Sequence, residues 1–199
     1  LELLLQAKLG ERVSGFASSL AMKPGGVALI TQSGSAFSAL AYNDQRLKFQ
    51  LCVSSGRELT TTTSDYVDWA LDQPDTSVIG LFLETARRPD DFARCLEKAA
   101  RLGIPVVVLK VGRTELSAGF AASHSGAIAG DNAAYEALFD RWGVLGVDTL
   151  DQLAANLTLF SASRPAARGG LASLHDSGGE REMVADLAAK AGVPFAAIS

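Results

Sequence analysis

The stretch Val78-Ile79-Gly80-Leu81-Phe82-Leu83-Glu84 stays uncharged and largely apolar until it ends in a carboxylate. A strand with one solvated face alternates apolar and polar residues, whereas a parallel strand covered on both faces is a continuous apolar run. The stretch therefore predicts a buried parallel strand. Four further runs of this kind lie at residues 27–31, 51–54, 106–111 and 144–147.

Amphipathic helical patterns fill the gaps between these runs. In one of them, Phe92, Cys95, Leu96 and Ala99 recur at the spacing that places them on one helix face. Residues able to cap or open the helices stand before the patterns, namely Ser64, Asp90 or Asp91, Asp131 and Thr149. Five consecutive strand–helix units predict an α/β fold with an open, doubly wound parallel sheet.

Composition narrows the class of protein. The chain has 199 residues, 48% of them hydrophobic, and a formal net charge of −4, which argues against nucleic-acid binding. Its two cysteines, Cys52 and Cys95, are far apart and lie among apolar residues, so we expect reduced core thiols in a cytoplasmic protein. No apolar run reaches the ~18 residues of a membrane-spanning helix. The chain begins with Leu1 and shows no signal-peptide pattern, so we expect a fragment.

The chain divides into a main domain at residues 24–163, a linker at 164–169 rich in Arg, Pro and Ala, and a second unit at 170–199. In the second unit the pattern restarts with a strand at Leu171–His175, a helix at Gly178–Ala191 and a strand from Phe195, which predicts the start of a second α/β domain. Residues 1–9 are compatible with a helix, and the following residues to 23 with a connection.

The segments 25–34 and 169–178 match each other at a constant offset of 144 residues. Each consists of Gly-Gly, a strand, and Ser-Gly at the start of a helix. An ancient duplication and the general likeness of any two strand–helix units explain this match equally well.

Two of these junctions are candidate phosphate sites. Ser33-Gly34-Ser35 and Ser177-Gly178-Gly179 stand where a strand passes into a helix, and small residues leave the first helical N–H groups accessible to an anion. The alternative is a tight turn with a serine cap. Thr31 and Ser35 occupy the positions at which a hydrolase elbow requires glycine, so Ser33 is not predicted to be a nucleophile.

The stretch 121–130, Ala-Ala-Ser-His-Ser-Gly-Ala-Ile-Ala-Gly, is the most informative one. His124 has little to pack against there, and its loop follows a strand whose carboxyl end is where such sheets bind ligands. Glu84 ends a strand at the same edge and could fix the tautomer of His124. The alternative for Glu84 is a strand-end carboxylate that faces water. His175 lies within a predicted strand and is interpreted as structural.

The order of these motifs, from Ser-Gly at a helix start through a strand ending in Glu to Ser123-His124-Ser125-Gly126, resembles the NDP-forming acyl-CoA synthetases. That family includes ADP-forming acetyl-CoA synthetase and is related to the succinyl-CoA synthetase α subunit. The resemblance covers residues 24–199 and implies a flavodoxin-like, succinyl-CoA ligase-like domain. It implies His124 as the phosphorylated residue and Glu84 as its hydrogen-bonding partner. The two Ser-Gly turns would hold phosphate.

The resemblance also implies the reaction, acyl-CoA + NDP + phosphate ⇌ carboxylic acid + CoA + NTP, by way of an acyl phosphate and a phosphohistidine. CoA, ATP or ADP, and Mg²⁺ are the implied cofactors. Residues 1–23 would connect to a missing CoA-binding domain, and an ATP-grasp domain in the same or a partner chain would bring the nucleotide. We expect a cytoplasmic oligomer that is inactive as the isolated fragment, with no membrane partner.

Two other classes remain open at this point. One is a non-catalytic regulatory domain of the same fold that binds acyl-CoA or phosphate, although such a domain would not need His124. The other is a flavodoxin-like binding module for a different phosphorylated ligand. The sequence leaves the identity of the carboxylic acid and of the nucleotide base open.

Overall fold

The computed structural model describes residues 6–8, 11–13, 23–117, 119–120, 132–162 and 169–197. It divides into two compact units, residues 1–162 and 163–199, which are described separately below. No helix within the described ranges is long and apolar enough to cross a membrane.

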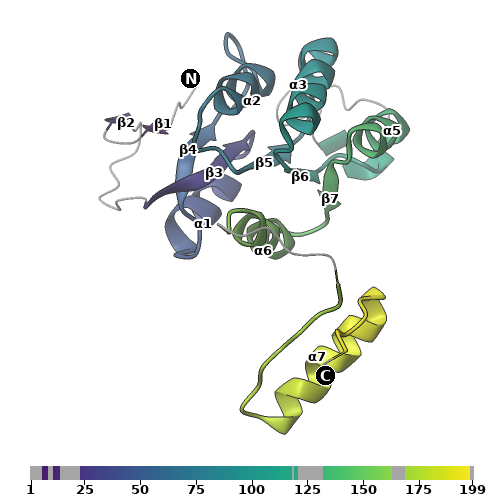
Figure 1. The fold of residues 1–199 in the computed structure, drawn as a ribbon. Coiled ribbons are helices and arrows are strands. Elements are labelled where there is room, and N and C mark those ends of the chain that lie inside the picture. The colour runs from purple at the N-terminus through teal and green to yellow at the C-terminus, as the bar shows by residue number, and fades with distance from the viewer. Residues whose placement is uncertain are drawn as a thin grey trace. The chain divides into compact units, whose positions relative to one another are not determined.

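The first unit is built on a five-stranded, all-parallel sheet (Figure 1). The strands are β3 (Pro24–Thr31), β4 (Phe49–Ser54), β5 (Val78–Leu83), β6 (Val106–Lys110) and β7 (Leu145–Val147). Their order is β4-β3-β5-β6-β7, so the chain leaves β4 on one side of β3 and returns as β5 on the other. This confirms the doubly wound, flavodoxin-like fold. It also creates a topological switch point between the carboxyl ends of β3 and β5, where such sheets bind ligands.

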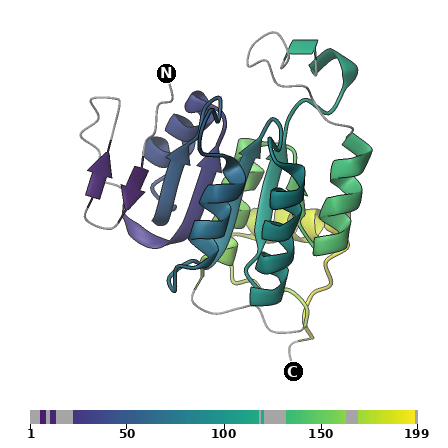
Figure 2. The ribbon, with the colours of Figure 1, turned by 90° about the horizontal axis from the view of Figure 1, so that it is seen from above.

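Helices cover both faces of the sheet (Figure 2). One layer contains α2 (Thr63–Leu71), α3 (Pro89–Leu102) and α5 (Asn132–Trp142), and the other contains α1 (Gly34–Asn43) and α6 (Leu150–Phe160). Because successive side chains of a strand point to opposite faces, Ala28 and Ile30 pack in the first layer while Val27 and Leu29 pack in the second. All four are buried, which explains the continuous apolar run.

Gly80 allows α6 to approach β5 closely. A Cβ atom on Gly80 would lie 2.7 Å from Cδ1 and 2.8 Å from Cδ2 of Leu157. Leu157 is fully buried, so it has little room to move. The glycine inside an otherwise bulky strand is therefore a packing requirement of the helix above it.

Several predicted boundaries differ from the structure. Helix α2 has Thr62 as its N-cap instead of Ser64, because the carboxylate of Asp65 accepts a hydrogen bond from the N–H of Thr62 at 2.8 Å. Helix α3 begins at Pro89 after Arg88, one residue before the predicted start, since proline suits the first helical position. Glu84 follows β5 and is not part of it. Asp131 lies outside the described residues, whereas the Thr149 cap of α6 is confirmed by its bond from the N–H of Gln152.

The two chain ends also depart from the predictions. A helix over residues 1–9 is wrong at Gln6–Lys8, which form β1 and pair antiparallel with β2 (Glu11–Val13). In the second unit α7 (Gly178–Ala191) is confirmed. The strands predicted beside it are reduced to one parallel bridge between Leu171 and Phe195. Leu174 is fully exposed, so an isolated strand pair there buries too little apolar surface to extend.

The two cysteines are confirmed as unpaired and buried. Burial raises the pKa of the Cys95 thiol to about 11 and that of Cys52 well above its usual value. Both groups are therefore protonated at neutral pH and act as small apolar core residues.

Candidate functional site

The N-terminus of α1 lies at the carboxyl edge of the sheet, directly after β3. Ser33 is the N-cap, and its side-chain oxygen accepts a bond from the N–H of Ala36 at 3.3 Å. The N–H groups of Gly34 and Ser35 have no hydrogen-bond partner among the described residues, and no atom lies within 4 Å of a Cβ built on Gly34. The first turn of α1 contains no acidic residue. These features leave two helical donors open to an anion.

Glu84 lies at the same edge, in the turn that follows β5. Its side chain is half-buried and has no hydrogen-bond partner among the described residues. The backbone around it is held firmly, since the N–H groups of Glu84 and Thr85 both donate to Oε1 of Gln32, at 2.6 and 3.0 Å. The free carboxylate on a fixed backbone is suited to accept a bond from a ligand or from another side chain.

Lys110 holds this turn from the opposite side. Its Nζ donates to the carbonyl oxygen of Glu84 at 2.8 Å and to that of Val111, and it lies 4.8 Å from the centre of the Tyr135 ring. Burial lowers the pKa of Lys110 to about 8, although the charge of Glu84 acts in the other direction. Tyr135 also contributes directly, because its hydroxyl oxygen accepts a bond from the N–H of Ala86 at 2.8 Å.

A buried polar cluster lies behind this turn. Nε2 of Gln32 donates to Oε1 of Glu58 at 2.8 Å and to the carbonyl oxygen of Thr85 at 2.7 Å. The same carboxylate oxygen of Glu58 accepts bonds from the hydroxyl groups of Ser55, at 2.9 Å, and Thr63. Glu58 is 6% exposed, and its second carboxylate oxygen is buried with no partner among the described residues. Buried carboxylates are costly and usually have a specific task.

The structure thus brings together some of the residues singled out in the sequence. Ser33, Gly34, Ser35 and Glu84 share the switch point, with Gln32 bonded to the turn of Glu84. His124 lies outside the described residues. Ser177 is the N-cap of α7, with Gly178 and Gly179 in its first turn, and belongs to the second unit. The shared phosphoryl path between the two Ser-Gly turns therefore stays a prediction.

Sequence reasoning missed the roles of Gln32 and Glu58. Gln32 lies beside the Ser-Gly motif, so its position offered a signal. Glu58 follows β4 in a polar loop, and only the fold brings it to Gln32.

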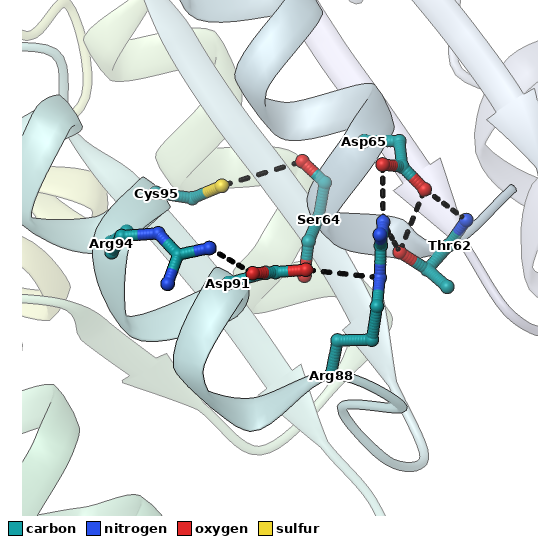
Figure 3. A network of polar contacts seen from close by, with 7 residues as sticks. All are labelled: Thr62, Ser64, Asp65, Arg88, Asp91, Arg94 and Cys95. Carbon is teal, nitrogen blue, oxygen red and sulfur yellow. Dashed lines mark hydrogen bonds and ion pairs between the residues drawn. The ribbon is translucent and has the colours of Figure 1, made fainter.

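A concave region of about 380 Å³ lies between α2 and α3. Figure 3 shows that its charged side chains pair with one another, since Arg88 contacts Asp65 and Asp91, and Arg94 also contacts Asp91. Sγ of Cys95 donates to the carbonyl oxygen of Ser64. These internal ion pairs tie the two helices together and leave little net charge for a ligand.

No group of three or more His, Cys, Asp or Glu side chains that could hold a metal ion is found in the part of the chain that the structure describes. Arg113, which follows β6, forms an ion pair with Asp148 at 2.6 Å.

Residues 24–160 match the family model described as the succinyl-CoA ligase like flavodoxin domain. Among curated proteins, the chain is 34% identical over 169 residues to a trans-feruloyl-CoA synthase from a prokaryote of unknown identity, which covers 84% of this chain and 24% of that protein. It is 33% identical over 181 residues to acetate–CoA ligase [ADP-forming] I of Archaeoglobus fulgidus, which covers 90% of this chain and 26% of that protein. The chain thus spans about a quarter of the length of these relatives.

Among solved structures, the chain resembles the dinucleotide forming acetyl-coenzyme A synthetase 1 of Ca. Korarchaeum cryptofilum in complex with phosphate and ADP. The TM-score is 0.81 at 28% sequence identity, over 96% of this chain and 42% of that one. The family model covers more than half of the residues, and the relatives and the solved structure agree with it. The chain therefore belongs to the NDP-forming acyl-CoA synthetase family.

Proposed function

We propose that this chain supplies the phosphoryl-transfer domain of an acid–CoA ligase that forms a nucleoside triphosphate. The observation that carries this proposal is the placement, at one switch point, of the Glu84 carboxylate and the N–H groups of Gly34 and Ser35, for which the described part of the chain supplies no hydrogen-bond partner. Relatives with acetate–CoA ligase [ADP-forming] names support the reaction class.

In the proposed reaction, phosphate attacks the acyl carbon of acyl-CoA, the thioester bond breaks, and CoA leaves as the thiol. A neutral imidazole nitrogen of His124 then attacks the phosphorus of the acyl phosphate, and the carboxylate leaves. The phosphohistidine finally gives its phosphoryl group to the nucleoside diphosphate, which yields the triphosphate. The sum is acyl-CoA + NDP + phosphate ⇌ acid + CoA + NTP.

Each group at the edge has a defined task in this scheme. The carboxylate of Glu84 accepts a bond from one ring nitrogen of His124, which fixes the tautomer and leaves the other nitrogen as the nucleophile. The N–H groups at the start of α1 bind phosphoryl oxygens, where the helix dipole favours negative charge. Ser177-Gly178-Gly179 is proposed as a second such cradle. The CoA and nucleotide sites are proposed to lie in other domains of the protein or its partners, with Mg²⁺ entering with the nucleotide.

Labelling of the full-length protein with γ-phosphate-labelled ATP tests this function. We expect an acid-labile, base-stable phosphoramidate that is lost in His124→Ala. His175→Ala is the matched control, because His175 is the second histidine of these 199 residues and its removal should keep the label. Label that survives in His124→Ala, or an unlabelled wild-type protein, would contradict the proposal. The second of these results would favour a non-catalytic binding domain.

A coupled assay that follows nucleotide formation from several acyl-CoA substrates then identifies the acid. The same assay with adenosine and guanosine diphosphates identifies the nucleotide. Formation of a triphosphate in this assay needs all domains, so the assay also shows whether they reside in one protein.

A further inference from the structure

We propose that Gln32 and Glu58 are positioning residues that hold the Glu84 turn in register with the N-terminus of α1. Their consequence for catalysis rests on the proposed function, whereas the geometry they impose is testable without any reaction. Neither residue has to touch the substrate for this role.

The Glu84 turn is held through its backbone by side chains from elsewhere in the fold. Gln32 accepts from the N–H groups of Glu84 and Thr85 and donates to the carbonyl oxygen of Thr85. Lys110 binds the carbonyl oxygen of Glu84, and Tyr135 accepts from the N–H of Ala86. Five consecutive backbone polar groups are thus bonded to side chains, and three of the five bonds belong to Gln32 alone.

Glu58 decides which way the Gln32 carboxamide faces. A carboxamide has an acceptor at one end and two donors at the other, so it could in principle turn over. An ionised carboxylate only accepts hydrogen bonds, and Oε1 of Glu58 lies 2.8 Å from Nε2 of Gln32. This pairing directs the NH₂ group toward Glu58 and leaves Oε1 of Gln32 for the N–H groups of Glu84 and Thr85. With the carboxamide reversed, donors would face donors.

Two features of Glu58 are energetically unfavourable in the folded protein. Its φ of 55° lies in the left-handed region, and it is the only residue other than glycine with a positive φ in the described part of the chain. One of its carboxylate oxygens is buried without a partner there. Strained backbone and buried polar atoms without a partner concentrate where a specific geometry is needed for function.

Gln32 also directly precedes Ser33, the N-cap of α1, and its N–H donates to the carbonyl oxygen of Phe82 in β5 at 3.1 Å. A shift of Gln32 would therefore move the proposed phosphate donors and Glu84 relative to each other. Displacements of about 1 Å can cost roughly 10²-fold in the rate of a reaction that depends on alignment.

The first experiment measures geometry. Site-resolved hydrogen exchange on the full-length protein should show faster exchange of the Glu84 and Thr85 amides in Gln32→Ala. The Ala86 amide, held by Tyr135, and the Leu29 amide in the core of β3 should keep their rates, which shows that the variant is folded. Gln73→Ala is the matched control, since Gln73 donates to the carbonyl oxygen of Trp69 at the end of α2. Unchanged exchange of Glu84 and Thr85 would overturn the proposed geometry.

The second experiment measures the consequence for phosphorylation. We expect the labelling rate of Gln32→Ala to fall by about 10²-fold, as alignment effects of this kind do. Gln32→Glu should also be slow, because two carboxylates then face each other.

The double variant Gln32→Glu/Glu58→Gln should recover part of the rate. The acceptor then stands at position 32, where it can still bind the N–H groups of Glu84 and Thr85, and the donor stands at position 58. A merely structural loss would not be repaired by this exchange.

The outcomes separate the two proposals. A wild-type labelling rate in Gln32→Ala together with faster exchange would overturn the positioning role and leave the proposed function intact. Absence of recovery in the double variant, with the exchange of the Leu29 amide normal in it, would also count against the positioning role. An unlabelled wild-type protein would overturn the proposed function, while the exchange data would still decide the geometry.

Discussion

Oε1 of Gln32 and the backbone N of Glu84 lie 2.6 Å apart, although 52 positions separate the two residues in the sequence. This bond crosses the switch point between β3 and β5 and joins the junction before α1 to the turn after β5. It thereby places the N-terminus of α1 and the Glu84 carboxylate in one fixed arrangement.

Replacing Glu84 by Gln should slow phosphoryl labelling while leaving stability unchanged. The side chain bonds to no described residue, and the bonds that fix the turn involve only its backbone. The amide that replaces the carboxylate is neutral and stabilises less well the positive charge that the imidazole ring gains when its other nitrogen takes the phosphoryl group. Labelling kinetics and thermal unfolding of the same samples check this. Wild-type labelling kinetics would show that Glu84 is only a strand-end carboxylate.

Inorganic phosphate should perturb the amide resonances of Gly34 and Ser35 in the full-length protein. Both N–H groups are open, and the first turn of α1 carries no acidic residue, so the helix dipole acts without opposition. Leu150 and Asp151 at the start of α6 are the internal control, because the carboxylate of Asp151 repels anions there. Chloride at equal ionic strength separates specific binding from screening. Equal shifts at both helices would contradict an anion site at α1.

Lys110 should make stability depend on pH in the alkaline range. Its folded pKa is lowered to about 8 from 10.5, mainly by burial, so the unfolded chain binds more protons between these values. The contribution of Lys110 to the free energy of unfolding therefore rises with pH across this window. Below about pH 8, the destabilisation caused by burying the charged Lys110 side chain is fully present.

Urea unfolding between pH 7 and pH 10 tests this with Lys110→Met. The wild-type protein should gain stability relative to Lys110→Met as pH rises through the window. Lys98→Met is the control, because Lys98 forms ion pairs with Asp68 and Asp72 and its pKa is raised above its usual value. Burial lowers the pKa of Lys98, but these carboxylates outweigh that effect, so its contribution stays constant until the pH passes 10.5. A pH-independent difference for Lys110→Met would contradict the prediction.

Gly80→Ala should destabilise the domain by about 1–3 kcal/mol, the usual cost of overpacking a core. The added Cβ would overlap the side chain of Leu157, which is one of the buried residues of α6. Gly146→Ala in β7 is matched to it, since no atom lies within 4 Å of its Cβ position, and should change stability by less than about 0.5 kcal/mol. Equal midpoints of the two variants in urea would show that α6 moves away without cost.

The order and type of the elements could be predicted from the amino-acid pattern alone. Continuous apolar runs such as residues 78–83 occur where both faces of a strand are covered, and this local signal predicted the parallel sheet and its two helical layers. The same pattern placed Ser33 and Glu84 at strand ends, because the residue at which an apolar run ends can be read directly from the sequence. Helix starts were predicted less accurately. Thr62 caps α2 in place of the predicted Ser64, because several neighbouring hydroxyl residues can serve as the N-cap.

Which strand ends are neighbours became known from the folded arrangement of the sheet. Strand order results from the packing of all helices against the sheet, and no local pattern specifies that β3 lies between β4 and β5. The contacts of Gln32 with Glu58 and Glu84 depend on that order, because they join three loops that are distant in sequence. Long-range hydrogen bonds of buried polar groups form after the chain has been brought together, so their partners are fixed by topology and carry no signal in the sequence.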